Sequence, residues 1–217
     1  MSSTISKKQL AGIIIERLKK EYPDAECTLT YGEPWQLLVS VRLAAQCTDA
    51  RVDKTTPLLF ARFPGVEALA AAPVEEIEEI IKPCGFYHSK ARDISLCMKR
   101  LMECHGGRVP DTMEELLTLP GVGRKSANLI LGDVYGQPAI VVDTHCIRLC
   151  GLTGLVPENE KDPVKIEMRL KKIVPPEEGN NLCHRFVLHG RAVCIARRPR
   201  CSDCCLRDVC RYGRRVS

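Results

Sequence analysis

The sequence lacks any apolar run long enough to cross a membrane. Its most hydrophobic cluster, residues 13–15, is followed at once by Glu16 and Arg17, whereas a membrane-spanning helix needs roughly 20 predominantly apolar residues. Residues 1–10 also lack an apolar stretch ahead of a small-residue cleavage site, so nothing there predicts secretion. We therefore expect a cytoplasmic protein.

Alternating runs of Val, Ile and Thr are nearly absent as well, and this argues against a β-sheet. Apolar residues recur instead at helical spacing, as in Leu10, Ile14 and Leu18. Glycine and proline breakers divide the chain into helices of ordinary length, without an internal repeat or a low-complexity linker. The sequence therefore predicts an all-α fold.

Three aspartates stand where helices are expected to begin. Asp111 is followed three residues later by Glu114, which is typical of a capping box, and Asp162 is followed by Pro163, a favoured first helical residue. Asp143 precedes a helical segment and is predicted to be its N-cap. Capping alone would account for Asp143, although a capping carboxylate can also face a functional site.

Positive charge is concentrated at one end of the chain. The net charge is +5, but residues 191–217 contain eight arginines and two aspartates, a local surplus of +6 that leaves the remainder at −1. Such a patch suggests a polyanionic partner. Solvated arginines on a tail would have the same composition, so charge alone leaves both interpretations open.

The stretch Leu119-Pro120-Gly121-Val122-Gly123-Arg124-Lys125 lies between two predicted helices. Gly121 and Gly123 permit backbone conformations closed to other residues, and their N–H groups at the start of the second helix can hold a phosphate. The pattern is typical of a helix-hairpin-helix motif that binds the DNA backbone. A Gly-x-Gly pair on its own would indicate only a turn.

Four of the thirteen cysteines, Cys194, Cys201, Cys204 and Cys210, form one C-terminal array. Thiolates in tetrahedral coordination can hold zinc or an iron–sulfur cluster. Structural zinc usually takes two Cys-x2–4-Cys pairs, whereas this array has only one, and the spacing alone leaves both metals open. The neighbouring Cys205 is expected to be a spectator.

Taken together, these motifs resemble those of the endonuclease III family of helix-hairpin-helix DNA glycosylases. The resemblance extends over nearly the whole chain. Its further segments, besides the hairpin and the cysteine array, are Leu37-Leu38, Leu43–Asp49, Gly85–Ala91, Val142–His145 and Leu188–Arg191.

The resemblance implies two helical domains that flank a DNA-binding cleft: a six-helix barrel over residues 27–137, and a domain formed by residues 1–26 and 138–217 that holds a 4Fe-4S cluster on the cysteine array. It implies a monomer that acts on duplex DNA in the nucleoid of a bacterium or archaeon. The residues expected to contact DNA are Gln46, Phe86, Gly121, Val122, Gly123, Arg124, Arg148, Arg191, Arg197, Arg198 and Arg200. Gln46 matches the residue that fills the gap left by the extruded base. Phe86 stands where the family often has a leucine wedge.

The resemblance further implies that Lys125 is the catalytic nucleophile and Asp143 the catalytic aspartate. The enzyme would flip an oxidised pyrimidine nucleotide out of the duplex. The Lys125 amine would then attack the sugar C1′ and form an imine that permits β-elimination. Asp143 would take the amine's proton or stabilise positive charge on the sugar, and the sequence leaves both roles open.

Two alternatives remain at this stage. A monofunctional glycosylase of the mismatch adenine type has a small hydroxyl residue at the lysine position, and Lys125 argues against it. A DNA-binding or electron-transfer protein without enzymatic activity would need only the hairpin and the cluster, and would leave Lys125 and Asp143 without a role.

Overall fold

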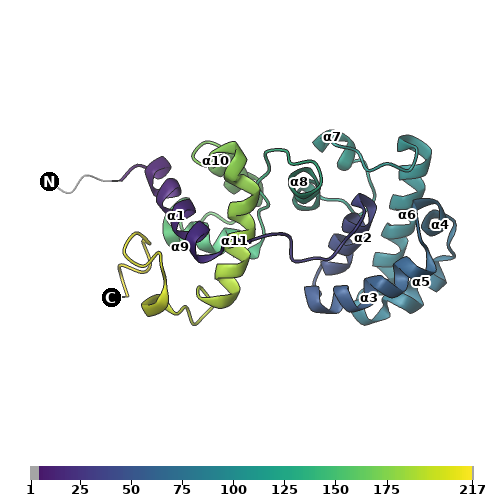
Figure 1. Cartoon of the computed structure of the whole chain (residues 1–217), viewed down its shortest axis with the longest axis horizontal. Helices are drawn as coiled ribbons and strands as arrows, with labels where there is room; N and C mark the ends of the chain where they lie inside the picture. The colour runs from purple at the N-terminus through teal and green to yellow at the C-terminus, as the bar shows by residue number, and fades with distance from the viewer. Residues whose placement is uncertain (1–4, 217) are drawn as a thin grey trace. The chain divides into compact units, whose positions relative to one another are not determined.

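The structure is a computed structural model of the 217-residue chain, in which residues 5–216 are described. All regular elements in that range are helices, and it contains no strand (Figure 1), so the predicted all-α fold is confirmed. No helix in this range is long and apolar enough to cross a membrane. Backbone contacts divide the chain into two compact units: Cys27–Tyr135, and Met1–Glu26 together with Gly136–Ser217. The resemblance implies a second boundary at about 137/138, and the division by contacts falls at 135/136.

The unit of residues 27–135 is built around α6 (Tyr87–His105), which packs against α4, α5 and α2. Its buried face includes Ile94, Met98 and Leu101. The other elements of the unit are α2 (Pro34–Ala44), α3 (Asp49–Arg62), α4 (Val66–Ala71), α5 (Val74–Ile81), η1 (Lys82–Cys84), α7 (Met113–Leu116) and α8 (Arg124–Asp133). The six-helix barrel that the resemblance implies for this region stays a prediction.

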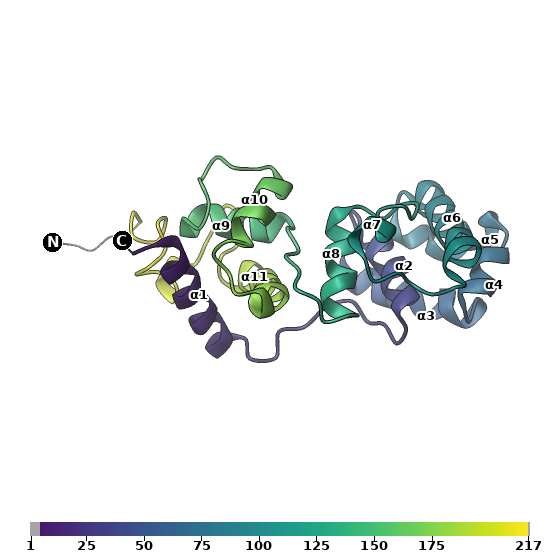
Figure 2. The same ribbon diagram turned by 90° about the horizontal axis from the view of Figure 1, so that it is seen from above.

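The second unit joins the two ends of the chain. Its elements are α1 (Lys7–Glu21), α9 (Thr144–Thr153), α10 (Pro163–Leu170), η2 (Pro176–Glu178), α11 (Gly179–Ala192) and η3 (Cys201–Asp203). Helix α11 contacts both α1 and α9. The C-terminal loop, drawn in yellow in Figure 2, lies beside α1, where Arg17 donates hydrogen bonds to the Asp208 carboxylate and to the Cys205 carbonyl.

Helices α9 and α11 approach each other closely at Gly190. A Cβ atom built on this residue would lie 2.4 Å from Nδ1 of His145 and 2.9 Å from Nη2 of Arg148. Any side chain at this position would therefore clash with the His145 ring and the Arg148 guanidinium as they are placed here. The close approach brings α9, which begins next to Asp143, against the helix that leads into the cysteine array.

Candidate catalytic residues and metal-binding pocket

Lys125 lies in the first turn of α8, directly after the hairpin turn. Gly123 is the N-cap of this helix, and the Lys125 side chain is exposed. Gly121 has φ +74°, and a Cβ there would meet Asp93 at 2.9 Å, so both the backbone and the available space favour glycine. Asp93 itself accepts a 2.7 Å hydrogen bond from Nε of Arg42. The hairpin is thus held against α2 and α6, and it presents the amine of Lys125 to solvent.

Asp143 is the N-cap of α9, as the sequence predicts. Its Oδ1 accepts a 2.7 Å hydrogen bond from the backbone N–H of Cys146, and the side chain is half-buried. A carboxylate in this position is held in a fixed orientation and benefits from the positive end of the helix dipole. One oxygen is committed to the cap, and the carboxylate as a whole can still accept further hydrogen bonds.

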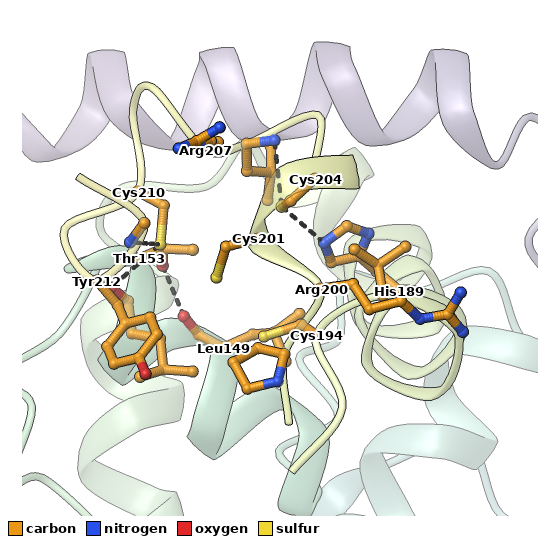
Figure 3. Close-up of a pocket in the computed structure, with 15 residues that line it drawn as sticks. Leu149, Thr153, His189, Cys194, Arg200, Cys201, Cys204, Arg207, Cys210 and Tyr212 are labelled. Atoms are coloured by element: carbon orange, nitrogen blue, oxygen red, sulfur yellow. Dashed lines mark hydrogen bonds between the residues drawn. The ribbon is translucent and has the colours of Figure 1, made fainter. Parts of the chain in front are cut away.

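The four cysteines of the C-terminal array line a single pocket, shown in Figure 3. Its other walls include the apolar side chains of Leu149, Leu152, Val193 and Leu206. Cys205 does not line the pocket. Within residues 5–216, no group of three or more His, Cys, Asp or Glu side chains is arranged to hold a single metal ion.

Hydrogen-bond donors point at the sulfur atoms of this pocket. The backbone N–H of Leu206 donates to Sγ of Cys204, and that of Gly213 donates to Sγ of Cys210, each at 3.4 Å. Burial raises the pKa of the Cys204 thiol to about 11. A thiolate in this pocket therefore needs positive charge beside it, and a bound metal centre supplies such charge.

His189 connects the cysteine pocket to α1, and sequence reasoning missed it. Its Nε2 lies 3.4 Å from Sγ of Cys204, and its Nδ1 lies 3.2 Å from the hydroxyl of Tyr22. Burial lowers the pKa of His189 to about 4, so the ring is neutral near pH 7. A neutral ring has one donor and one acceptor nitrogen, which fits a chain of hydrogen bonds from Tyr22 through His189 to Cys204. The sequence offers no signal for this contact beyond the segment Leu188–Arg191.

The arginines expected to contact DNA differ in their surroundings. Arg191, Arg197, Arg198 and Arg200 are exposed around the cysteine array. Nη2 of Arg148 instead donates to the carbonyls of Gly190 and Cys194, at 3.1 and 2.8 Å. Arg148 therefore ties α9 to the start of the cysteine array, and its predicted contact with DNA remains a prediction.

Gln46 and Phe86 share an uncommon backbone conformation. Within residues 5–216, the non-glycine residues with positive φ are Gln46 (+53°), Phe86 (+49°) and Arg197 (+69°), and all three are among the residues expected to contact DNA. Both Gln46 and Phe86 are exposed, and the Phe86 side chain is 66% accessible although it is large and apolar. Such conformations persist where the surrounding structure imposes them, and they are common at ligand-binding sites.

Comparison with known proteins agrees with the sequence-based interpretation. Residues 39–176 match the family described as HhH-GPD superfamily base excision DNA repair protein. The chain is 48% identical to an endonuclease III of Synechocystis sp., over 94% of this chain and 93% of that protein. The chain belongs to the endonuclease III family. The chain is also 40% identical to the endonuclease III of Escherichia coli strain K12, over 94% of this chain and 95% of that protein.

The structure of this endonuclease III family member also matches a solved structure of a trapped endonuclease III–DNA covalent intermediate. The two share a TM-score of 0.91 and 38% sequence identity, over 98% of this chain and 99% of the other. The predicted family membership is therefore confirmed, and the predicted function in base excision repair is confirmed at the level of the family.

Proposed function

We propose that this chain is a bifunctional DNA glycosylase and AP lyase that removes oxidised pyrimidines from duplex DNA, with Lys125 as its nucleophile and Asp143 as the partner carboxylate. The observation that carries the proposal is the exposed Lys125 amine, which lies in the first turn of α8 after the Gly121-Val122-Gly123 turn, in a member of the endonuclease III family. The hairpin amides and the exposed arginines bind DNA phosphates, and the enzyme works as a monomer in the cytoplasm, associated with the nucleoid.

In this mechanism Asp143 takes a proton from the Lys125 ammonium group, and the lone pair of the resulting amine then attacks C1′ of the flipped nucleotide. The bond from C1′ to the base breaks, and the base leaves with the electron pair and takes up a proton. The nitrogen lone pair then forms a double bond to C1′ while the C1′–O4′ bond breaks and O4′ takes up a proton, which opens the sugar ring and leaves a protonated imine between Nζ and C1′. Removal of a proton from C2′ then expels the 3′ phosphate, and the strand is cut. The oriented carboxylate at the start of α9 also stabilises the positive charge that develops on the sugar.

Incision of duplexes that each carry one lesion tests this function. Cleavage at thymine glycol without added alkali or heat is expected, because the lyase step needs no further reagent. Release of the base without strand cleavage would contradict the bifunctional mechanism and favour the monofunctional alternative. Binding without base release would favour a non-enzymatic role.

We also propose that Cys194, Cys201, Cys204 and Cys210 hold a 4Fe-4S cluster. Four cysteine thiolates are the usual ligand set of such a cluster, and these four would hold it. A pocket lined by all four cysteines, with backbone N–H groups directed at the sulfurs, fits such a group. When bound, the cluster supplies a rigid cross-link for the loop that carries Arg197, Arg198 and Arg200.

Metal analysis of the purified protein is expected to give about four irons per chain. Cys204→Ser should lower the iron content, because it removes one of the four ligands. The matched control is Cys205→Ser, which changes the adjacent residue outside the pocket and should leave the iron content unchanged. One zinc and no iron per chain would contradict the assignment.

The exposed arginines provide a test of phosphate binding. The slope of log K against log salt is negative, and replacing Arg197, Arg198 and Arg200 with alanine should make it less steep by about 2.7, because each phosphate contact contributes about 0.9. The measurement is a salt titration of binding to an undamaged duplex. An unchanged slope would show that these side chains face solvent in the complex.

A further inference from the structure

Lys90 on α6 is a buried lysine to which the proposed mechanism gives no role. Its side chain is 1% exposed. Its Nζ donates two hydrogen bonds, each of 2.8 Å, to the backbone carbonyls of Leu43 and Cys84. Burial lowers the pKa of the amine, and the nearby Cys47 and Cys84 thiols act in the opposite direction. A buried amine is unfavourable unless its hydrogen bonds are satisfied, so these two carbonyls account for its position.

The two carbonyls belong to segments that are distant in the sequence. Leu43 lies in the last turn of α2, three residues before Gln46. Cys84 ends η1, two residues before Phe86. Lys90 therefore joins the backbone just before one positive-φ residue to the backbone just before the other. A lysine used only to fill the core would not need both carbonyls, and an apolar side chain would fill the same space.

We propose that Lys90 is a positioning residue that fixes two loops relative to each other: the Gln46 loop, residues 45–48, and the Phe86 loop, residues 85–86. The exposed side chains of Gln46 and Phe86 then enter the duplex together at the position from which a nucleotide has been flipped out. Lys90 itself is buried and does not touch DNA. Without the amine, the Leu43 and Cys84 carbonyls lose their shared donor, and the two loops are free to move independently. This inference rests on the proposed function.

The test compares a duplex that carries thymine glycol with single-stranded DNA that carries an abasic site. Only in the duplex does the flipped nucleotide leave a gap that Gln46 and Phe86 must fill. Lys90→Met keeps the length and the apolar stem of the side chain but removes the donors. Excision of thymine glycol from a duplex should fall about tenfold or more, since two buried acceptors lose their partner. Cleavage of an abasic site in single-stranded DNA, which has no opposite base and no stack to restore, should stay within about twofold of wild type. The matched control is Lys99→Met, on the exposed face of the same helix, which should behave as wild type on both substrates.

Equal loss on both substrates, or no loss on either, in a folded Lys90→Met protein would overturn the inference. If Lys90→Met does not fold, Lys90→Gln takes its place, because its shorter side chain no longer brings one donor group to both carbonyls, and the same selective loss on the duplex is expected. Failure of both variants to fold would also overturn it, since the amine would then be needed by the whole unit and not by two loops. Wild-type protein inactive on both substrates would refute the proposed function instead, so the two failures are distinguishable.

Discussion

Replacing Lys125 with glutamine is expected to lower base excision by about a thousandfold or more and to abolish strand cleavage. The variant removes the only amine that the mechanism uses, and an amide cannot attack C1′ at a comparable rate. The measurement is single-turnover incision of a thymine glycol duplex. Because Lys125 is exposed, the substitution should change the free energy of unfolding by no more than about 0.5 kcal/mol.

The control for this experiment is Lys99→Gln, the same change at an exposed lysine on α6. It should leave incision unchanged. If Lys125→Gln retained strand cleavage, another amine would be the nucleophile. If it released bases without cleaving the strand, Lys125 would serve only the second step.

Asp143→Asn is expected to keep the fold and to lower base release by about 10²- to 10⁴-fold. Asparagine also caps helices well, so the hydrogen bond from the N–H of Cys146 is retained. The amide carries no charge and is a poor base, so it neither takes the proton of Lys125 nor stabilises charge on the sugar. Single-turnover base release and thermal unfolding together measure the two effects.

The chain offers a matched control in Asp162, which caps α10 by accepting hydrogen bonds from the N–H groups of Val164 and Lys165. Asp162→Asn makes the same chemical change at another helix start and should leave base release unaffected. If Asp143→Asn lost stability but kept its turnover, Asp143 would be a cap and nothing more.

Local patterns in the sequence predict the helix starts well where one residue alone fits the pattern. Asp143 and Asp162 cap α9 and α10 as predicted. The predicted capping box of Asp111 and Glu114 is wrong, because Thr112 caps α7 and accepts a hydrogen bond from the N–H of Glu115. Two acceptable pairs with the same spacing stand one residue apart here, and short-range spacing does not choose between them.

Other features depend on contacts between segments far apart in the sequence. The carbonyl of Leu43 is 47 residues from Lys90, and that of Cys194 is 46 residues from Arg148. Nothing in either local sequence marks these side chains as internal donors, and charge alone suggests solvent or DNA. The contact between His189 and Cys204 likewise appears only when α11 and the C-terminal loop lie together.

The central claim is that the Lys125 amine forms a covalent bond with the sugar, and borohydride reduction tests it most directly. Wild-type protein mixed with a thymine glycol duplex and borohydride should run as a stable protein–DNA adduct, because the reductant converts the imine to an amine that no longer hydrolyses. Peptide mapping should place the attached sugar on Lys125, and Lys125→Gln should give no adduct while still binding the duplex. An adduct that persists in Lys125→Gln, or a wild-type enzyme that releases bases but is never trapped, would contradict the account.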